Sequence, residues 1–176
     1  MNIKSLIVIS LMFSTLFGCA TLPKPLQDTP ALRDVPFMVV KQNPDKYYNV
    51  SLLWGGRITK CTNIEDGTVL EILHLPLAKD GYPSETDASQ GRFIAKSKNF
   101  LDCAVYSKDR YITVIGKFKG FKEGKIDEMS YFFPLIETQA TYLWKKRICY
   151  LQYPCLRPSF WFWYGSPRWS IEYGPW

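Results

Sequence analysis

Histidine and long apolar runs are scarce in this chain of 176 residues. His74 is the one histidine, and the sequence has no Cys-x-x-Cys pair, so the ligand spacing typical of zinc sites is missing. No Gly-x-Ser-x-Gly nucleophile motif accompanies His74 either. We therefore expect no metal, no cofactor and no catalysis. In a run of leucines, His74 is expected to be a packed or edge-exposed strand residue.

The N-terminus carries the longest apolar segment, from Leu6 to Phe17, after the basic Lys4. A membrane-spanning helix needs roughly 20 apolar residues, so this segment is typical of an export signal. The signal ends at Gly18-Cys19, which resembles the bacterial lipobox. The resemblance implies cleavage before Cys19, a diacylglycerol on its sulfur and a further acyl chain, such as palmitate, on its amine. An ordinary secretory signal with a coincidental cysteine is the alternative.

Lipidation at Cys19 would anchor the mature protein without a spanning helix. Each buried methylene contributes about 0.8 kcal/mol, so two or three chains hold a protein on a membrane where one holds it marginally. Ala20 follows the cysteine where inner-membrane lipoproteins typically carry Asp, which implies sorting to the outer membrane, facing the periplasm. Lipid of that membrane is the first expected partner.

Length and charge fit one exported domain. Removing residues 1–18 from the 176 leaves 158, and removing Lys4 leaves 21 basic against 16 acidic residues, a net charge of +5. The basic residues form no run beyond Lys145–Arg147. This modest excess suits contact with anionic lipid headgroups or envelope polymers. Nucleic acid is not an expected partner of an exported chain.

Four cysteines remain once Cys19 is lipidated, and an even number in an oxidising compartment indicates two disulfides. Four cysteines allow three pairings, which the sequence alone does not decide. Because Pro154 bends the short segment between Cys149 and Cys155, we favour that pair together with Cys61 and Cys103.

The mature chain is expected to open with a tether over residues 19–34, because Pro23, Pro25 and Pro30 disfavour a helix. One or two helical turns are expected between Val35 and Tyr48. Strands are expected at Val50–Thr62, Thr68–Leu77, Gly91–Ala95, Arg110–Lys119 and Ile126–Glu137, with turns at Asn63–Gly67 and Lys122–Lys125. Gly55-Gly56 indicates a bulge or sharp coil. The predicted fold is all-β, a small five- to six-stranded OB-like barrel over residues 35–144.

Several segments in order along the chain resemble the Slp family of outer-membrane lipoproteins. They are Trp54–Ile58, Pro76-Leu77, Gly91–Ala95, Phe100–Asp102, Arg110–Lys117, Tyr131–Leu135 and Leu143-Trp144. With the lipobox, the resemblance covers most of the chain. It departs at Cys103, where Phe-Leu-Asp is expected to continue with proline. The resemblance implies an outer-membrane lipoprotein linked to stationary phase and stress.

Arg57, Arg92 and Arg110 each lie beside a glycine or at a strand start within these segments. We expect their stems to pack on the barrel and their charges to pair with Asp102 or Asp87; an anion-binding cleft is the alternative. The loop carboxylates Asp80, Asp87, Asp102 and Asp109 are expected to serve turns.

The C-terminal tail, residues 145–176, is rich in aromatic residues. Eight of the seventeen residues from Phe160 to Trp176 are Phe, Trp or Tyr, including Trp161, Trp163, Trp169 and Trp176. Three hypotheses compete for the role of this tail. It is an interfacial membrane anchor, a binding surface for an envelope protein or glycan, or a segment that folds back to cover the barrel.

The function expected from these features is that of a structural or interaction component of the cell envelope. An OB-like module that binds a glycan, lipid or small anionic ligand is the alternative.

Overall fold

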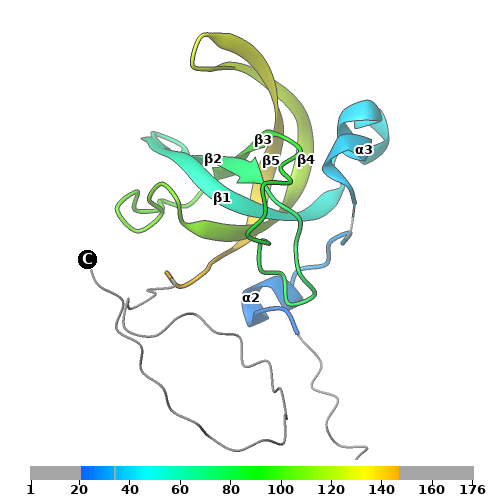
Figure 1. Ribbon diagram of the computed structural model, residues 1–176, viewed down its shortest axis with the longest axis vertical. Coiled ribbons are helices and arrows are strands. Elements are labelled where there is room, and N and C mark those ends of the chain that lie inside the picture. The colour runs from blue at the N-terminus through cyan, green and yellow to red at the C-terminus, as the bar shows by residue number, and fades with distance from the viewer. Residues whose placement is uncertain (1–20, 34, 147–176) are drawn as a thin grey trace, which may run out of the picture. The chain divides into compact units, whose positions relative to one another are not determined.

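The structure, a computed structural model, describes residues 21–33 and 35–146. Five strands form a closed barrel in the order β1-β2-β3-β5-β4 (Figure 1). They are β1 (Ser51–Ile64), β2 (Gly67–His74), β3 (Arg92–Ser97), β4 (Tyr111–Ile126) and β5 (Met129–Leu143). All neighbouring pairs are antiparallel except β3 and β5. The predicted all-β, OB-like barrel is therefore confirmed.

Strand β1 serves two neighbours. It pairs with β4 over Ser51–Arg57 and with β2 over Gly56–Ile64, and its register shifts between Ile58 and Lys60. A Cβ on Gly56 would overlap the carbonyl oxygen of Leu73 in β2. The predicted bulge therefore exists, but it lies after the glycine pair, and Gly56 is required for close approach of the two strands.

Strands β4 and β5 continue past the barrel as a long hairpin (Figure 1). The turn predicted at Lys122–Lys125 is wrong, because these residues pair with Phe133–Ser130 inside the ladder. The chain turns instead between Ile126 and Met129, where Asp127 adopts a φ of 53°. Aspartate tolerates this left-handed conformation, so Asp127 could make the turn without the glycine on which the prediction rested.

The segment before the barrel is part of the fold over its described residues. Pro23 precedes the short helix α2 (Lys24–Gln27), and Leu22 and Leu26 are buried in an apolar cluster with Leu53 of β1 and Ile115 of β4. The prediction of a tether is therefore wrong over this stretch. Proline disfavours the interior of a helix but fits its first turn, and α2 is little more than one turn.

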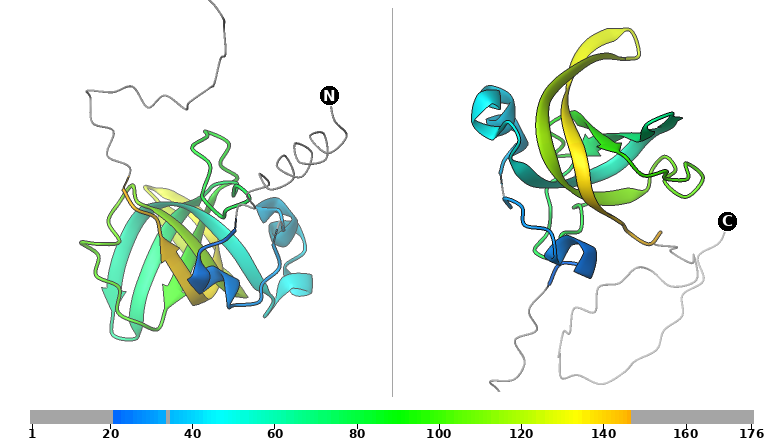
Figure 2. Two further views of the ribbon diagram at one scale, coloured as in Figure 1. Left: turned by 90° about the horizontal axis from the view of Figure 1, so that it is seen from below. Right: turned by 180° about the vertical axis from the view of Figure 1, so that it is seen from behind.

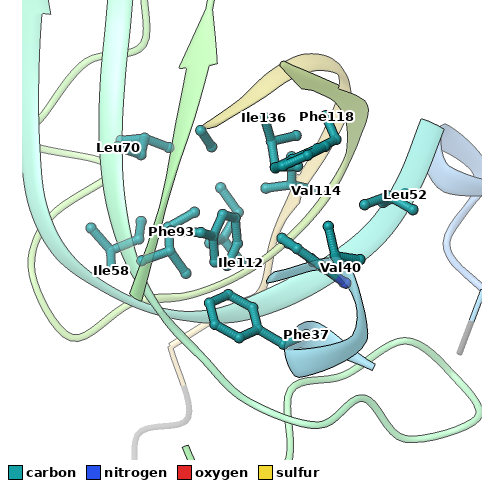
Figure 3. Close-up of a cluster of buried hydrophobic side chains, with 13 residues drawn as sticks. Phe37, Val40, Leu52, Ile58, Leu70, Phe93, Ile112, Val114, Phe118 and Ile136 are labelled. Carbon is teal, nitrogen blue, oxygen red and sulfur yellow. The ribbon is translucent and has the colours of Figure 1, made fainter. Parts of the chain in front are cut away.

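The predicted helical turns between Val35 and Tyr48 are present as α3 (Phe37–Gln42) and α4 (Pro44–Tyr47). Helix α3 contributes Phe37 and Val40 to the core (Figure 3). These side chains are buried with inward-facing residues of the strands, among them Ile58, Phe93 and Phe118. The core is thus closed by a helix as well as by the sheet.

A disulfide joins Cys61 of β1 to Cys103 in the loop before β4, with 5.5 Å between the two Cα atoms. This confirms one of the two favoured pairings. Cys149 and Cys155 lie outside the described residues, as do Cys19 and the aromatic residues from Phe160 onward.

Candidate functional site

The three arginines do not converge on one cleft. Arg57 and Arg92 both stand opposite Leu73 in the strand register, on either side of it. With neighbouring strands about 4.8 Å apart, their backbones are roughly 10 Å apart. Arg110 instead donates to the carbonyl oxygens of Val105 at 3.2 Å and Trp144 at 2.9 Å.

The acidic partners of the arginines differ from those predicted. Arg92 pairs with Glu71 at 3.0 Å, and Arg57 lies 3.8 Å from Asp109. The prediction of Asp102 or Asp87 is wrong because a strand neighbour, Glu71, is closer to Arg92 than any loop carboxylate. Asp102 accepts a hydrogen bond from the backbone N–H of Ala104, which is the turn role expected for it.

A pocket with a volume of about 480 Å³ lies where the segment before the barrel packs on it. Its wall comes from the segment before the barrel, from β1, and from the loop after β2. The lining includes Leu22, Arg33, Pro36, Leu53, Trp54, His74, Pro76, Leu77, Ala78 and Lys79. In Figure 1 and in the right view of Figure 2, the green loop between β2 and β3 runs down beside α2, so the three parts lie together in space.

His74 is the most unusual residue of this wall. It is 7% exposed, and its ring packs against Phe37, Trp54 and Phe93 at centroid distances of 4.7, 5.7 and 6.3 Å. Burial among these rings lowers the pKa of His74 to about 4, because the charged form loses its hydration. His74 is therefore neutral at pH 7. The structure confirms it as a packed strand residue.

The imidazole of His74 lacks hydrogen-bond partners among residues 21–33 and 35–146. Its Nδ1 is buried and unpaired in this part of the chain. A neutral imidazole has one donor and one acceptor, and buried polar groups are usually satisfied. His74 thus adds an unused polar group to a partly apolar pocket.

Two cations of this pocket, Arg33 and Lys79, were not predicted as site residues. Both are exposed, and neither forms an ion pair with a described carboxylate. Nothing in their local sequence marks them, because they are 46 positions apart and meet only through the packing of the N-terminal segment on the barrel.

A second hollow of about 450 Å³ lies between α3 and the β4–β5 hairpin. Lys41 is placed 5.2 Å from the ring centroid of Tyr131 there. Phe132 and Met129 on the same hairpin are 59% and 77% exposed. This hollow is lined by Lys41, Phe121, Ser130, Tyr131 and Phe132.

Among residues 21–33 and 35–146, no three His, Cys, Asp or Glu side chains are grouped to hold a metal ion. No helix within the same ranges is both long and apolar enough to cross a bilayer.

The chain is similar in sequence to several known proteins. The chain is 28% identical over 146 residues to the outer membrane protein Slp of Escherichia coli, covering 82% of this chain and 76% of that protein. It is 27% identical to the uncharacterized lipoprotein YeaY of the same organism, covering 90% and 80%. An uncharacterized protein of Haemophilus influenzae is 33% identical over 57% of this chain and 54% of its own length.

Among solved structures, a small single-stranded DNA-binding protein from Streptomyces coelicolor matches 54% of this chain and 94% of its own, with a TM-score of 0.32 and 11% identity. So distant a match carries nothing about ligands. The sequence pattern of one family, by contrast, matches residues 16–169, nearly the whole chain. This protein belongs to the outer membrane lipoprotein Slp family.

Proposed function

We propose that the protein is anchored to the outer membrane by lipid on Cys19, faces the periplasm, and acts there as a structural or interaction component of the envelope under stress. The family supports the outer-membrane setting. The Gly18-Cys19 sequence supports the anchor.

The observation that carries this proposal is the burial of Leu22 against the barrel, at 5% exposure, only three residues after Cys19. An extended chain spans at most about 3.5 Å per residue, so the three-residue link between Cys19 and the buried Leu22 can reach no farther than about 11 Å. A lipid on Cys19 would therefore hold the folded domain directly at the membrane surface. Such a placement suits a protein that organises contacts at the membrane.

Titratable groups of the described chain support a role without catalysis. The lone histidine is packed among three aromatic rings, and Asp80 and Asp102 accept hydrogen bonds from backbone N–H groups two residues ahead. These contacts are typical of turns and of a hydrophobic core. The two aspartates are therefore used to stabilise their own turns.

A ligand-binding module is the second candidate function. Arg57 and Arg92 are separated from each other and each lies near a carboxylate, which argues against an anion-binding cleft built from arginines. The pocket beside His74 favours this candidate, since it is concave, partly apolar and carries two cations without an acidic partner in the described part of the chain.

The anchor is tested by replacing the lipid acceptor. Cys19→Ala should shift the protein out of the outer-membrane fraction and abolish its labelling by radioactive palmitate. Cys149→Ala is the matched control and should leave both unchanged. Retention of the Cys19→Ala protein in the outer membrane would show that lipid is not the main attachment.

A further inference from the structure

The pocket beside His74 combines an apolar wall with a cationic one. Pro36, Pro76 and Leu77 supply apolar surface that is exposed or partly exposed, whereas Leu22 and Leu53 are buried in the wall. Arg33 and Lys79 supply positive charge, and both lack an acidic partner among the described residues. A volume of about 480 Å³ falls in the range of ligand pockets, which is roughly 300–1,000 Å³.

The wall also contains a polar group with no internal role. His74 is only 7% exposed, and its Nδ1 has no hydrogen-bond partner in the described chain. A structural histidine would normally hydrogen-bond to backbone or side chain. This nitrogen has almost no accessible surface, so the imidazole shapes the wall without being a contact for a ligand's polar atoms.

We propose that this pocket binds a single-chain anionic amphiphile, in which one acyl chain carries a carboxylate or phosphate headgroup. The chain lies along Pro36, Pro76 and Leu77, where it removes apolar surface from water. The headgroup is held by Arg33 and Lys79. A neutral lipid would leave both cations without a partner among the described residues, and a small hydrophilic anion would leave this apolar surface uncovered.

The ligand class follows from the pocket lining and does not depend on the lipid at Cys19. Loss of membrane attachment in the Cys19→Ala protein and loss of ligand binding in pocket variants are separate results, so either proposal can fail alone.

The test is photocrosslinking of the purified full-length protein in nanodiscs of zwitterionic lipid. The probes are diazirine-bearing palmitate, diazirine-bearing lysophosphatidylglycerol, and diazirine-bearing hexadecanol as the uncharged comparison. Peptide mapping by mass spectrometry should place the crosslinks of at least one anionic probe on the peptides that contain Leu22–Arg33 and Leu77–Lys79. Capture of the palmitate probe would identify the ligand as a fatty acid, and capture of the lysophosphatidylglycerol probe would identify it as a lysophospholipid.

Substitutions make the outcome specific. The double variant Arg33→Gln, Lys79→Gln should lower capture of the anionic probe about tenfold, the loss expected for charge-assisted hydrogen bonds. Lys108→Gln, Lys122→Gln removes two exposed charges outside the pocket lining and should leave capture unchanged. Ala78→Trp, at an exposed position of the pocket wall, should fill the space and abolish capture of both anionic probes.

Three results would overturn the proposal. One is capture of hexadecanol as strongly as of both anionic probes. Another is capture that survives the double variant together with Ala78→Trp. The third is mapping of all crosslinks away from the pocket. Circular dichroism and retention of the Cys61–Cys103 disulfide establish that each variant is folded.

Discussion

At the scale of single residues, Gly56 is the position where one added carbon should cost most. Its Cβ would overlap the carbonyl oxygen of Leu73, so β1 and β2 would have to separate. We expect Gly56→Ala to lower the free energy of unfolding by about 3 kcal/mol, in the range of overpacked cores. Urea unfolding followed by circular dichroism measures it. Gly124→Ala is the control, because the added Cβ would meet only ring atoms of Phe133, the nearest at 3.0 Å. This substitution should change the free energy of unfolding by less than about 1 kcal/mol.

His74 should make stability depend on pH between neutrality and mild acid. Its pKa is about 4 when folded and near 6.5 when unfolded, so the unfolded chain binds the proton more readily in between. This contribution is complete above pH 6.5 and declines as pH falls toward 4, by up to about 3 kcal/mol.

Unfolding free energies of the wild-type protein and His74→Gln at pH 7 and pH 5 test this. The wild-type protein should lose about 2 kcal/mol more than the variant over that interval. Glu137 does not interfere, since its pKa is lowered by Lys98 and its contribution is lost only below its unfolded pKa near 4.5. Equal losses in both proteins would mean that His74 keeps its proton when folded.

At the scale of elements, the sequence predicted strands better than the points where they end. The β-branched and aromatic runs gave β1, β2 and the start of β4 within a few residues, because these side chains fit a half-buried sheet. The glycine-containing segment Lys122–Lys125 was misread as a turn. A hairpin that extends past the barrel has no burial pattern to fix its tip, and Asp127 turns without glycine.

The candidate pocket was largely beyond sequence reasoning. His74 stood out as the one histidine, but its packing among three rings depends on α3 lying against the barrel. Arg33 and Lys79 come from segments expected to be a tether and a loop. They share a pocket only because Leu22 and Leu26 attach the N-terminal segment to the outer face of the barrel.

Helix α2 provides the test of that attachment. Leu26 is 1% exposed, so Leu26→Ala should lower the free energy of unfolding by about 2–5 kcal/mol, as for other buried leucines. Thermal unfolding by circular dichroism measures the change. Lys24→Ala, on the exposed side of the same helix, should cost less than about 0.5 kcal/mol. A Leu26→Ala protein as stable as the Lys24→Ala protein would show that the segment is a free tether after all.

At the scale of the whole barrel, the end that carries α2 and the tip of the β4–β5 hairpin lie apart. Helix α2 and the last described residues of the chain are at the bottom of Figure 1, and the tip of the β4–β5 hairpin is at the top. The rear view in Figure 2 shows the same separation. If lipid on Cys19 holds the α2 end at the membrane, the hairpin projects toward the periplasm with Met129 and Phe132 exposed.

Depth-dependent quenching tests this orientation in the full-length protein reconstituted into a bilayer. A fluorophore attached through Lys24→Cys should be quenched by brominated lipids in the same bilayer, because α2 lies within a few residues of Cys19. The same fluorophore attached through Glu128→Cys, at the hairpin turn, should be quenched little and should remain open to a water-soluble quencher. Both positions are exposed, so any difference reports distance from the lipid rather than burial in the barrel. Strong lipid quenching at Glu128→Cys would mean that the exposed hairpin residues rest on the membrane, and the hairpin would then be a second membrane contact instead of a surface for a periplasmic partner.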